Sequence, residues 1–209
     1  MKNIIIIGAG GFGREVYQWS LDAFDMNTYT IKGFLSKTQN DLDGFDIPVP
    51  ILGGEDNYNI EQDDVFIIAI GNVEIKRKVI EKLKAKNAVF LTLIHPTAII
   101  SSNSQIGEGV VICPYCIVTD NVKIGNYSKL NVYTYCGHDS EVGDHCVLSP
   151  YTTLNGGAKL GDGVFAATRS TITAEKLVGD NCIIGAHSIV LHDVADGTKV
   201  IGVSKKVVG

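Results

Sequence analysis

The N-terminal part of the chain alternates short apolar runs with amphipathic segments. Apolar runs at 2–7, 31–35 and 65–70 are typical of buried strands, and segment 74–86 has its apolar residues at helical spacing. The first run ends in the glycine-rich turn 8–13, after which a helix is expected to begin. Strands that alternate with helices predict a small parallel sheet, open at the carboxyl ends of its strands. We therefore expect a Rossmann-like α/β domain over residues 1–92.

From Ile94 onward, an apolar residue that is in most cases Ile, Leu or Val recurs every six residues as far as Val190. A small or β-branched residue follows four positions later, from Ala98 to Val194, with Lys176 as the exception. Glycine follows the aliphatic residue at intervals of 18, at Gly107, Gly125, Gly143, Gly161 and Gly179. Six-residue units in an 18-residue period predict three short strands per coil, with the aliphatic side chains stacked inside. The pattern predicts an all-β, left-handed parallel β-helix of hexapeptide repeats over residues 93–209, with about five coils.

Composition and charge narrow the classes of function. Hydrophobic residues make up 45% of the chain, but the longest apolar run, 65–70, is far too short to span a membrane. A net charge of -5 without a basic cluster argues against nucleic acid as a partner. Five cysteines without disulfide-like spacing favour a reducing compartment, and we expect the cytoplasm.

Four of the cysteines fall on positions that the hexapeptide pattern directs inward. Cys116, Cys146 and Cys182 occupy the small position, and Cys136 occupies the aliphatic one. We interpret them as buried thiols used as small apolar residues, and we expect no metal.

The most promising chemistry lies at His138 and Asp139, directly after Gly137. They fall at a corner of the predicted helix, where side chains point outward, and a carboxylate beside an imidazole can hold the tautomer of a general base. Gly156 lies one coil away and is expected to offer an uncovered backbone N–H to a carbonyl oxygen. The alternative is a solvated surface pair. His145 lies near the next corner, so a three-histidine metal site within one coil is not predicted, whereas one shared between subunits stays open.

The turn at Gly8, Gly10 and Gly13 fits the G-x-G-x-x-G pattern between strand and helix. A dinucleotide enzyme also needs an acid about 20 residues further on to bind the ribose. Gly33 stands near that place, and no acid follows in residues 34–37. The turn still suits a phosphate group, so nicotinamide is disfavoured and a mononucleotide or a sugar nucleotide stays open.

Taken together, the sequence resembles the sugar O- and N-acyltransferases similar to PglD and NeuD over essentially the whole chain. Segments 8–13, 33–35, 69–72, 93–98 and 137–139 carry the resemblance. It implies acetyl transfer from acetyl-CoA to an amino or hydroxyl group of a sugar, usually nucleotide-linked, in bacterial glycan synthesis, by direct attack without an acyl-enzyme. We expect the acceptor to be the amino group of a nucleotide-linked amino sugar. The resemblance implies His138 as the general base and Asp139 as the acid that orients it. The implied acetyl-CoA contacts are Gly156, Thr168 and Ala186.

The resemblance also implies a homotrimer with active sites between neighbouring β-helices, and a nucleotide-sugar site in the N-terminal domain. The expected substrate contacts there are Gly10, Gly11, Phe12, Ser36, Lys37, Gly71 and Asn72.

The sequence departs from the family pattern at several positions. Val147 stands where a second histidine is common, which puts a hydrogen bond to the acetyl group in doubt. Phe12 replaces a frequent histidine, and Ser36 with Lys37 replaces the uracil-binding Asp pair, so the choice between UDP and dTDP stays open. The ending 202–205, Gly-Val-Ser-Lys, differs from the usual Gly-Val-Pro-Ala-Lys, and we expect weaker or different contact with CoA there.

Three other functions remain as alternatives. An O-acetyltransferase would act on a sugar such as a sialic acid. A catalytically silent sugar-nucleotide-binding protein would bind its ligand without CoA turnover. A metal-dependent hydratase, with histidines that meet across a trimer interface, would contain stoichiometric zinc.

Overall fold

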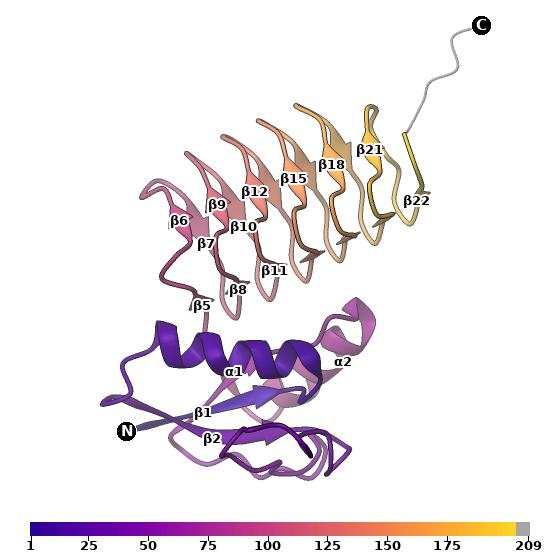
Figure 1. The fold of residues 1–209 in the computed structure, drawn as a ribbon. Coiled ribbons are helices and arrows are strands. Elements are labelled where there is room, and N and C mark those ends of the chain that lie inside the picture. The colour runs from indigo at the N-terminus through magenta and orange to yellow at the C-terminus, as the bar shows by residue number, and fades with distance from the viewer. Residues whose placement is uncertain (204–209) are drawn as a thin grey trace, which may run out of the picture. The chain divides into compact units, whose positions relative to one another are not determined.

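The computed structural model describes residues 1–203 and divides into two compact units, the first spanning Met1–Leu93 and the second beginning at Ile94. The first unit contains a parallel sheet with the strand order β2-β1-β3-β4 (Figure 1). Its elements are β1 (Lys2–Ile7), α1 (Gly11–Ala23), β2 (Tyr29–Leu35), β3 (Asp64–Ile68), α2 (Val73–Lys84) and β4 (Val89–Phe90). The central strands β1 and β3 supply most of the core, since the side chains of 4–7 and 65–68 are almost entirely buried. Strand β3 ends two residues before the apolar run does.

The glycine turn lets α1 begin directly against β1. Gly8 has a φ of +104°, a conformation that favours glycine. A Cβ atom on Gly13 would collide with the carbonyl oxygen of Gly8, so the first turn of α1 can approach the strand only without a side chain there.

A buried carboxylate begins strand β3. Asp64 accepts hydrogen bonds from Lys32, Asn3, the Tyr58 hydroxyl and the backbone N–H of Glu61, at 2.8–3.2 Å. Burial by itself raises the pKa of Asp64, but these hydrogen bonds lower it more, so the pKa of this carboxyl lies below its usual value.

We predict that Asp64→Ala lowers the free energy of unfolding by about 3 kcal/mol at pH 7, because four donors, one of them the cation of Lys32, lose their buried partner. Since the folded-state pKa is depressed, the stabilisation by Asp64 is present above the unfolded pKa of about 3.9 and is lost as the pH falls through the lower folded value. Urea denaturation at pH 7 and at acid pH measures both effects. Asp63→Ala is the control: it removes an exposed pair with Lys2 and should change the free energy by less than about 1 kcal/mol. An equal loss in both variants would contradict the prediction.

The second unit is a parallel β-helix whose two-residue strands form three sheets (Figure 1). The seven-stranded sheet contains β5 (Leu93–Ile94), β8 (Val111–Ile112), β11 (Lys129–Leu130), β14 (Val147–Leu148), β17 (Phe165–Ala166), β20 (Ile183–Ile184) and β22 (Lys199–Val200). The six-stranded sheet contains β6 (Ile99–Ile100), β9 (Ile117–Val118), β12 (Tyr135–Cys136), β15 (Thr153–Leu154), β18 (Thr171–Ile172) and β21 (Ile189–Val190). The five-stranded sheet contains β7 (Gln105–Ile106), β10 (Lys123–Ile124), β13 (Glu141–Val142), β16 (Lys159–Leu160) and β19 (Leu177–Val178).

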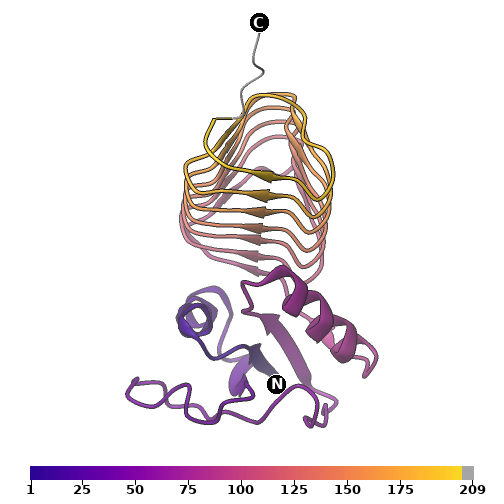
Figure 2. The same cartoon turned by 90° about the vertical axis from the view of Figure 1, so that its right-hand side faces the viewer.

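Each strand from β6 to β18 pairs with the strand 18 residues further on, and Figure 2 shows one such sheet as a column of stacked arrows. The aliphatic positions from Val118 to Val190 lie inside, and all five cysteines are fully buried free thiols. The prediction of an α/β domain followed by a left-handed hexapeptide β-helix is confirmed. The expectation of about five coils was one coil short. Each coil contributes one strand to each sheet, and the three sheets contain five, six and seven strands, which corresponds to about six coils.

The hexapeptide period breaks after Val190. Val194 forms a bridge with Val178, 16 residues earlier, instead of occupying the small corner position that the period assigned to it. The backbone N–H of Leu177 donates to the Asp193 side chain, which closes this shorter turn. The assignment of Val194 was therefore wrong, because a shortened corner moves it into a strand position.

Within the part of the chain that the structure describes, no helix has both the length and the apolar character that crossing a membrane requires.

Candidate active site

His138 and Asp139 form a held pair on the corner between β12 and β13. The Nδ1 atom of His138 lies 2.9 Å from Oδ2 of Asp139, and the two side chains are 72% and 57% exposed. Asp139 has a φ of +60°, and its backbone N–H donates to the carbonyl of Asp120 one coil away. Asn121 donates to Oδ1 of Asp139 at 2.7 Å. The carboxylate is therefore fixed from two sides, and it fixes the imidazole in turn.

The charge state of Asp139 follows from these contacts. The hydrogen bond from Asn121, and then the one from His138, hold the pKa of Asp139 below its usual value. An ionised carboxylate at Nδ1 favours the tautomer with its proton on that nitrogen, which leaves the Nε2 lone pair of the neutral ring directed away from Asp139. The pair can therefore accept a proton at Nε2.

Glycine is required beneath the imidazole ring. A Cβ atom on Gly156 would lie 2.5 Å from both Cε1 and Nε2 of His138, so the ring packs against the bare backbone of the next coil. The backbone N–H of Gly157 donates to the His138 carbonyl at 2.8 Å. The N–H of Gly156 has no acceptor among the residues that the structure describes. A Cβ atom on Gly137 would lie 2.8 Å from this nitrogen, so Gly137 also keeps it open.

The other two expected acetyl-CoA contacts lie on a different corner. Thr168 lies between β17 and β18, and Ala186 lies between β20 and β21, both exposed and one coil apart. Within one chain the six-stranded sheet separates them from His138 and Gly156, so the chain does not bring the four residues together.

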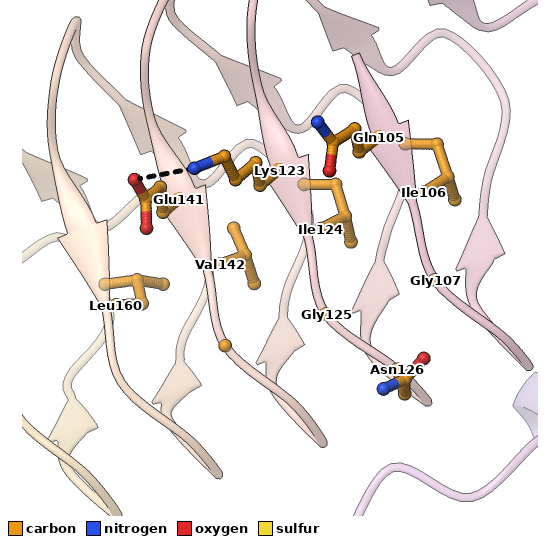
Figure 3. A pocket seen from close by; sticks show the side chains of 11 residues that line it. Gln105, Ile106, Gly107, Lys123, Ile124, Gly125, Asn126, Glu141, Val142 and Leu160 are labelled. Carbon is orange, nitrogen blue, oxygen red and sulfur yellow. Dashed lines mark ion pairs between the residues drawn. The ribbon is translucent and has the colours of Figure 1, made fainter.

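A groove of about 340 Å³ crosses the five-stranded sheet and is lined by residues of β7, β10, β13 and β16 (Figure 3). Its floor contains Gly107, Gly125 and Gly143, where a Cβ atom would collide with the following coil. Glu141, two residues after Asp139, lines it and lies between Lys123 at 3.5 Å and Lys159 at 3.1 Å. The groove therefore offers a polar, charge-balanced surface on this sheet, and neither His138 nor Asp139 lines it.

His145 and Val147 lie apart from this pair. His145 occupies the corner between β13 and β14 and stacks on Tyr127, with 5.3 Å between ring centroids. Val147, at the position of the family's second histidine, is buried in β14. Among the described residues there is no group of three or more His, Cys, Asp or Glu side chains that could hold a metal ion.

A second cavity, of about 590 Å³, lies in the first unit at the carboxyl ends of β1, β2 and β3. Of the expected substrate contacts, Ser36 and Lys37 line it. The other five lie at the first turns of the helices without lining the cavity. Gly10 precedes α1 as its N-cap, and Asn72 caps α2 by accepting a hydrogen bond from the backbone N–H of Ile75. Gly11, Phe12 and Gly71 adjoin these caps.

Glu55 is a lining residue that the sequence did not indicate. It lies in the long connection between β2 and β3, and the Ser36 N–H bond to the Gly53 carbonyl brings this connection to the end of β2. Its side chain is 9% exposed and pairs with Lys37 at 3.1 Å. No strand or helix pattern surrounds it, so only the fold reveals this acid.

Ser204 and Lys205, the altered tail positions, lie outside the described residues, so the expectation about CoA contact there stays a prediction.

Comparison with known proteins gives one family match, to the PglD N-terminal domain over residues 3–83. A curated relative from Bacillus subtilis strain 168, a UDP-N-acetylbacillosamine N-acetyltransferase, is 30% identical over 123 residues, which cover 54% of this chain and 51% of that protein. The chain thus spans about half the length of this relative.

Two of the solved structures that resemble this chain serve as examples, and each matches nearly its whole length. PerB from Caulobacter crescentus, determined in complex with CoA and GDP-perosamine, has a TM-score of 0.87 at 24% identity, covering 100% of this chain and 98% of PerB. The acetyltransferase domain of PglB from Neisseria gonorrhoeae, determined with acetyl coenzyme A, has a TM-score of 0.84 at 26% identity and covers 95% of each chain. The first likeness supports the fold, and the resemblance to PglD-like proteins seen in the sequence is confirmed.

Proposed function

We propose that this chain, which matches the PglD N-terminal domain over residues 3–83, transfers the acetyl group of acetyl-CoA to the amino group of a nucleotide-linked amino sugar in bacterial glycan biosynthesis. One observation carries the proposal. The His138 imidazole is held by Asp139 at Nδ1 and packs on Gly156, whose N–H lacks an acceptor among the described residues. A base thus lies beside a free backbone donor, as acyl transfer requires.

The proposed reaction is a direct attack. The sugar amine bonds to the thioester carbonyl carbon while Nε2 of His138 takes a proton from the nitrogen. The negative charge that develops on the carbonyl oxygen accepts a hydrogen bond from the Gly156 N–H. The carbon–sulfur bond then breaks, and the proton on His138 goes to the departing CoA sulfur. The products are the N-acetyl sugar and free CoA thiol, and no acyl-enzyme forms.

We also propose that the working form is a homotrimer. Thr168 and Ala186 lie on another corner than His138, so a second copy is needed to bring these acetyl-CoA contacts to the base. Exposed apolar side chains on the six-stranded sheet, Ile99, Ile117 and Ile189, support self-association. The proposed compartment is the cytoplasm, because all five cysteines are free thiols.

The direct test is thiol release from acetyl-CoA with a panel of UDP-, GDP- and dTDP-linked amino sugars, each paired with the same sugar carrying a hydroxyl in place of the amine. Turnover with an amino sugar and not with its hydroxyl counterpart is expected. Turnover with the hydroxyl sugars alone would replace the proposal by O-acetylation. Ligand binding without thiol release from any acceptor would favour the catalytically silent protein.

Asp139→Asn is predicted to lower kcat by about 10-fold to 100-fold with little change in KM. The neutral amide replaces the carboxylate that holds the proton on Nδ1 of His138 and stabilises the charged ring. Steady-state thiol release measures the effect. Glu175→Gln is the control, since Glu175 is an exposed acid at the same corner position two coils away, with a φ of +61°. An Asp139→Asn variant as active as Glu175→Gln would show that the pair is only a solvated surface contact.

A further inference from the structure

The cavity of the first unit contains an acid at the place where the sequence lacked one. A nucleotide-binding parallel sheet commonly uses an acid at the end of its second strand to bind the ribose hydroxyls. Strand β2 ends at Leu35, and Ser36 and Lys37 follow without an acid. Glu55 reaches the same point from the connection between β2 and β3, through its contact with Lys37.

One oxygen of Glu55 remains available to a ligand. Both ion pairs of this carboxylate, to Lys37 at 3.1 Å and to Lys82 at 3.9 Å, use Oε1. Oε2 has no partner among the described residues, although the side chain is only 9% exposed. Oε2 is also not among the buried polar atoms that lack a partner, so it is open to the cavity that Glu55 lines, where a ligand can donate hydroxyl groups to it.

The rest of the cavity fits a nucleotide around this acid. Gly8 follows β1 and begins the glycine turn, which suits the phosphates. Lys78 and Lys82 of α2 line the cavity and add positive charge, while Ile70 and Ile75 supply an apolar wall for a base. The volume of about 590 Å³ is within the range of small-molecule sites.

We propose that Glu55 binds the 2′- and 3′-hydroxyls of the ribose, so that the enzyme selects ribonucleotide-linked sugars, such as those of UDP or GDP, over 2′-deoxyribonucleotide-linked sugars such as those of dTDP. The inference rests on the proposed function only in taking a sugar nucleotide as the ligand. The absence of the 2′-hydroxyl leaves Oε2 of Glu55 buried against a C–H group, which disfavours the deoxy ligand.

Isothermal titration calorimetry of the full chain with UDP and 2′-deoxy-UDP, and with GDP and 2′-deoxy-GDP, tests the inference because each pair differs only in the 2′-hydroxyl. The ribonucleotide of at least one pair is expected to bind about 10-fold or more tightly than its deoxy form. Glu55→Ala should bring this ratio to about one, and Glu55→Gln, which keeps the shape of the side chain, should lower it at least about threefold.

Asp56→Ala is the matched control. Asp56 pairs with the same two lysines, at 3.7 and 2.7 Å, but it is 51% exposed and does not line the cavity. The ratio should survive in this variant. A wild-type ratio near one, a ratio that survives Glu55→Ala, or no binding of any of these nucleotides would each overturn the inference. Thiol release from acetyl-CoA with amino-sugar acceptors decides the acetyl transfer independently, so the two failures are distinguishable.

Discussion

Replacement of His138 by asparagine is expected to lower kcat for acetyl transfer by at least about 100-fold, with KM for both substrates changed little. Asparagine keeps a polar side chain at the exposed corner but cannot take a proton from the attacking amine. The site on Gly156 and the rest of the coil stay intact, so substrate binding is retained. Initial rates of thiol release, with the substrates varied in turn, separate the loss in kcat from any change in KM.

His192 provides the control, because it repeats the same dipeptide three coils away in the 18-residue period. Asp193 follows it, yet the Asp193 carboxylate accepts from the Leu177 N–H, and no ion pair joins it to His192. His192→Asn should therefore leave kcat within about twofold of wild type. If His138→Asn keeps its activity, or if both variants lose it equally, the assignment of His138 as the base is wrong.

The fold was predictable because it depends on a period. Three short strands per coil require an aliphatic residue every six positions, and that spacing stands in the sequence from Ile94 to Val190. Where the period ends, the prediction ends as well. Val194 was misplaced, and the last coil with β22 was not counted, because a shortened corner obeys local hydrogen bonding at Asp193 instead of the repeat.

The pairing of His138 with Gly156 was also accessible from the sequence, since residues 18 apart lie on adjacent coils. The sequence led us to expect an uncovered backbone at Gly156. Only the coordinates show that the His138 imidazole packs against this backbone. The 18-residue offset cannot give the side-chain rotamer, which follows from the Asp139 contact.

Glu55 could not be found in the same way. It lies in an irregular connection whose course depends on contacts such as the Ser36 bond to Gly53. Neither apolar periodicity nor spacing from the glycine turn predicts such a contact, because the motif expects its acid about 20 residues after the turn. The chain places its acid far beyond that point.

Gly156→Ala is expected to reduce kcat by about 100-fold while the protein stays folded. The added methyl group would lie 2.5 Å from Cε1 and Nε2 of His138, so the imidazole must leave its place over the backbone and lose its alignment with Asp139. The ring is 72% exposed and free to turn outward, so the cost falls on catalysis and not on the coil. Thermal unfolding and thiol release, measured on the same preparation, separate the two.

Gly157→Ala reverses the expected pattern. Gly157 has a φ of +67°, and a Cβ atom there would meet only Glu175, at 3.4 Å from Cγ and at 3.8–3.9 Å from its backbone, which is ordinary contact. Alanine there should cost about 1 kcal/mol of stability through backbone strain and leave kcat within about threefold of wild type. Two adjacent glycines would then lose different properties to the same methyl group. Equal losses of activity in both variants would show that activity is lost through damage to the structure of the coil, and not through displacement of the His138 ring.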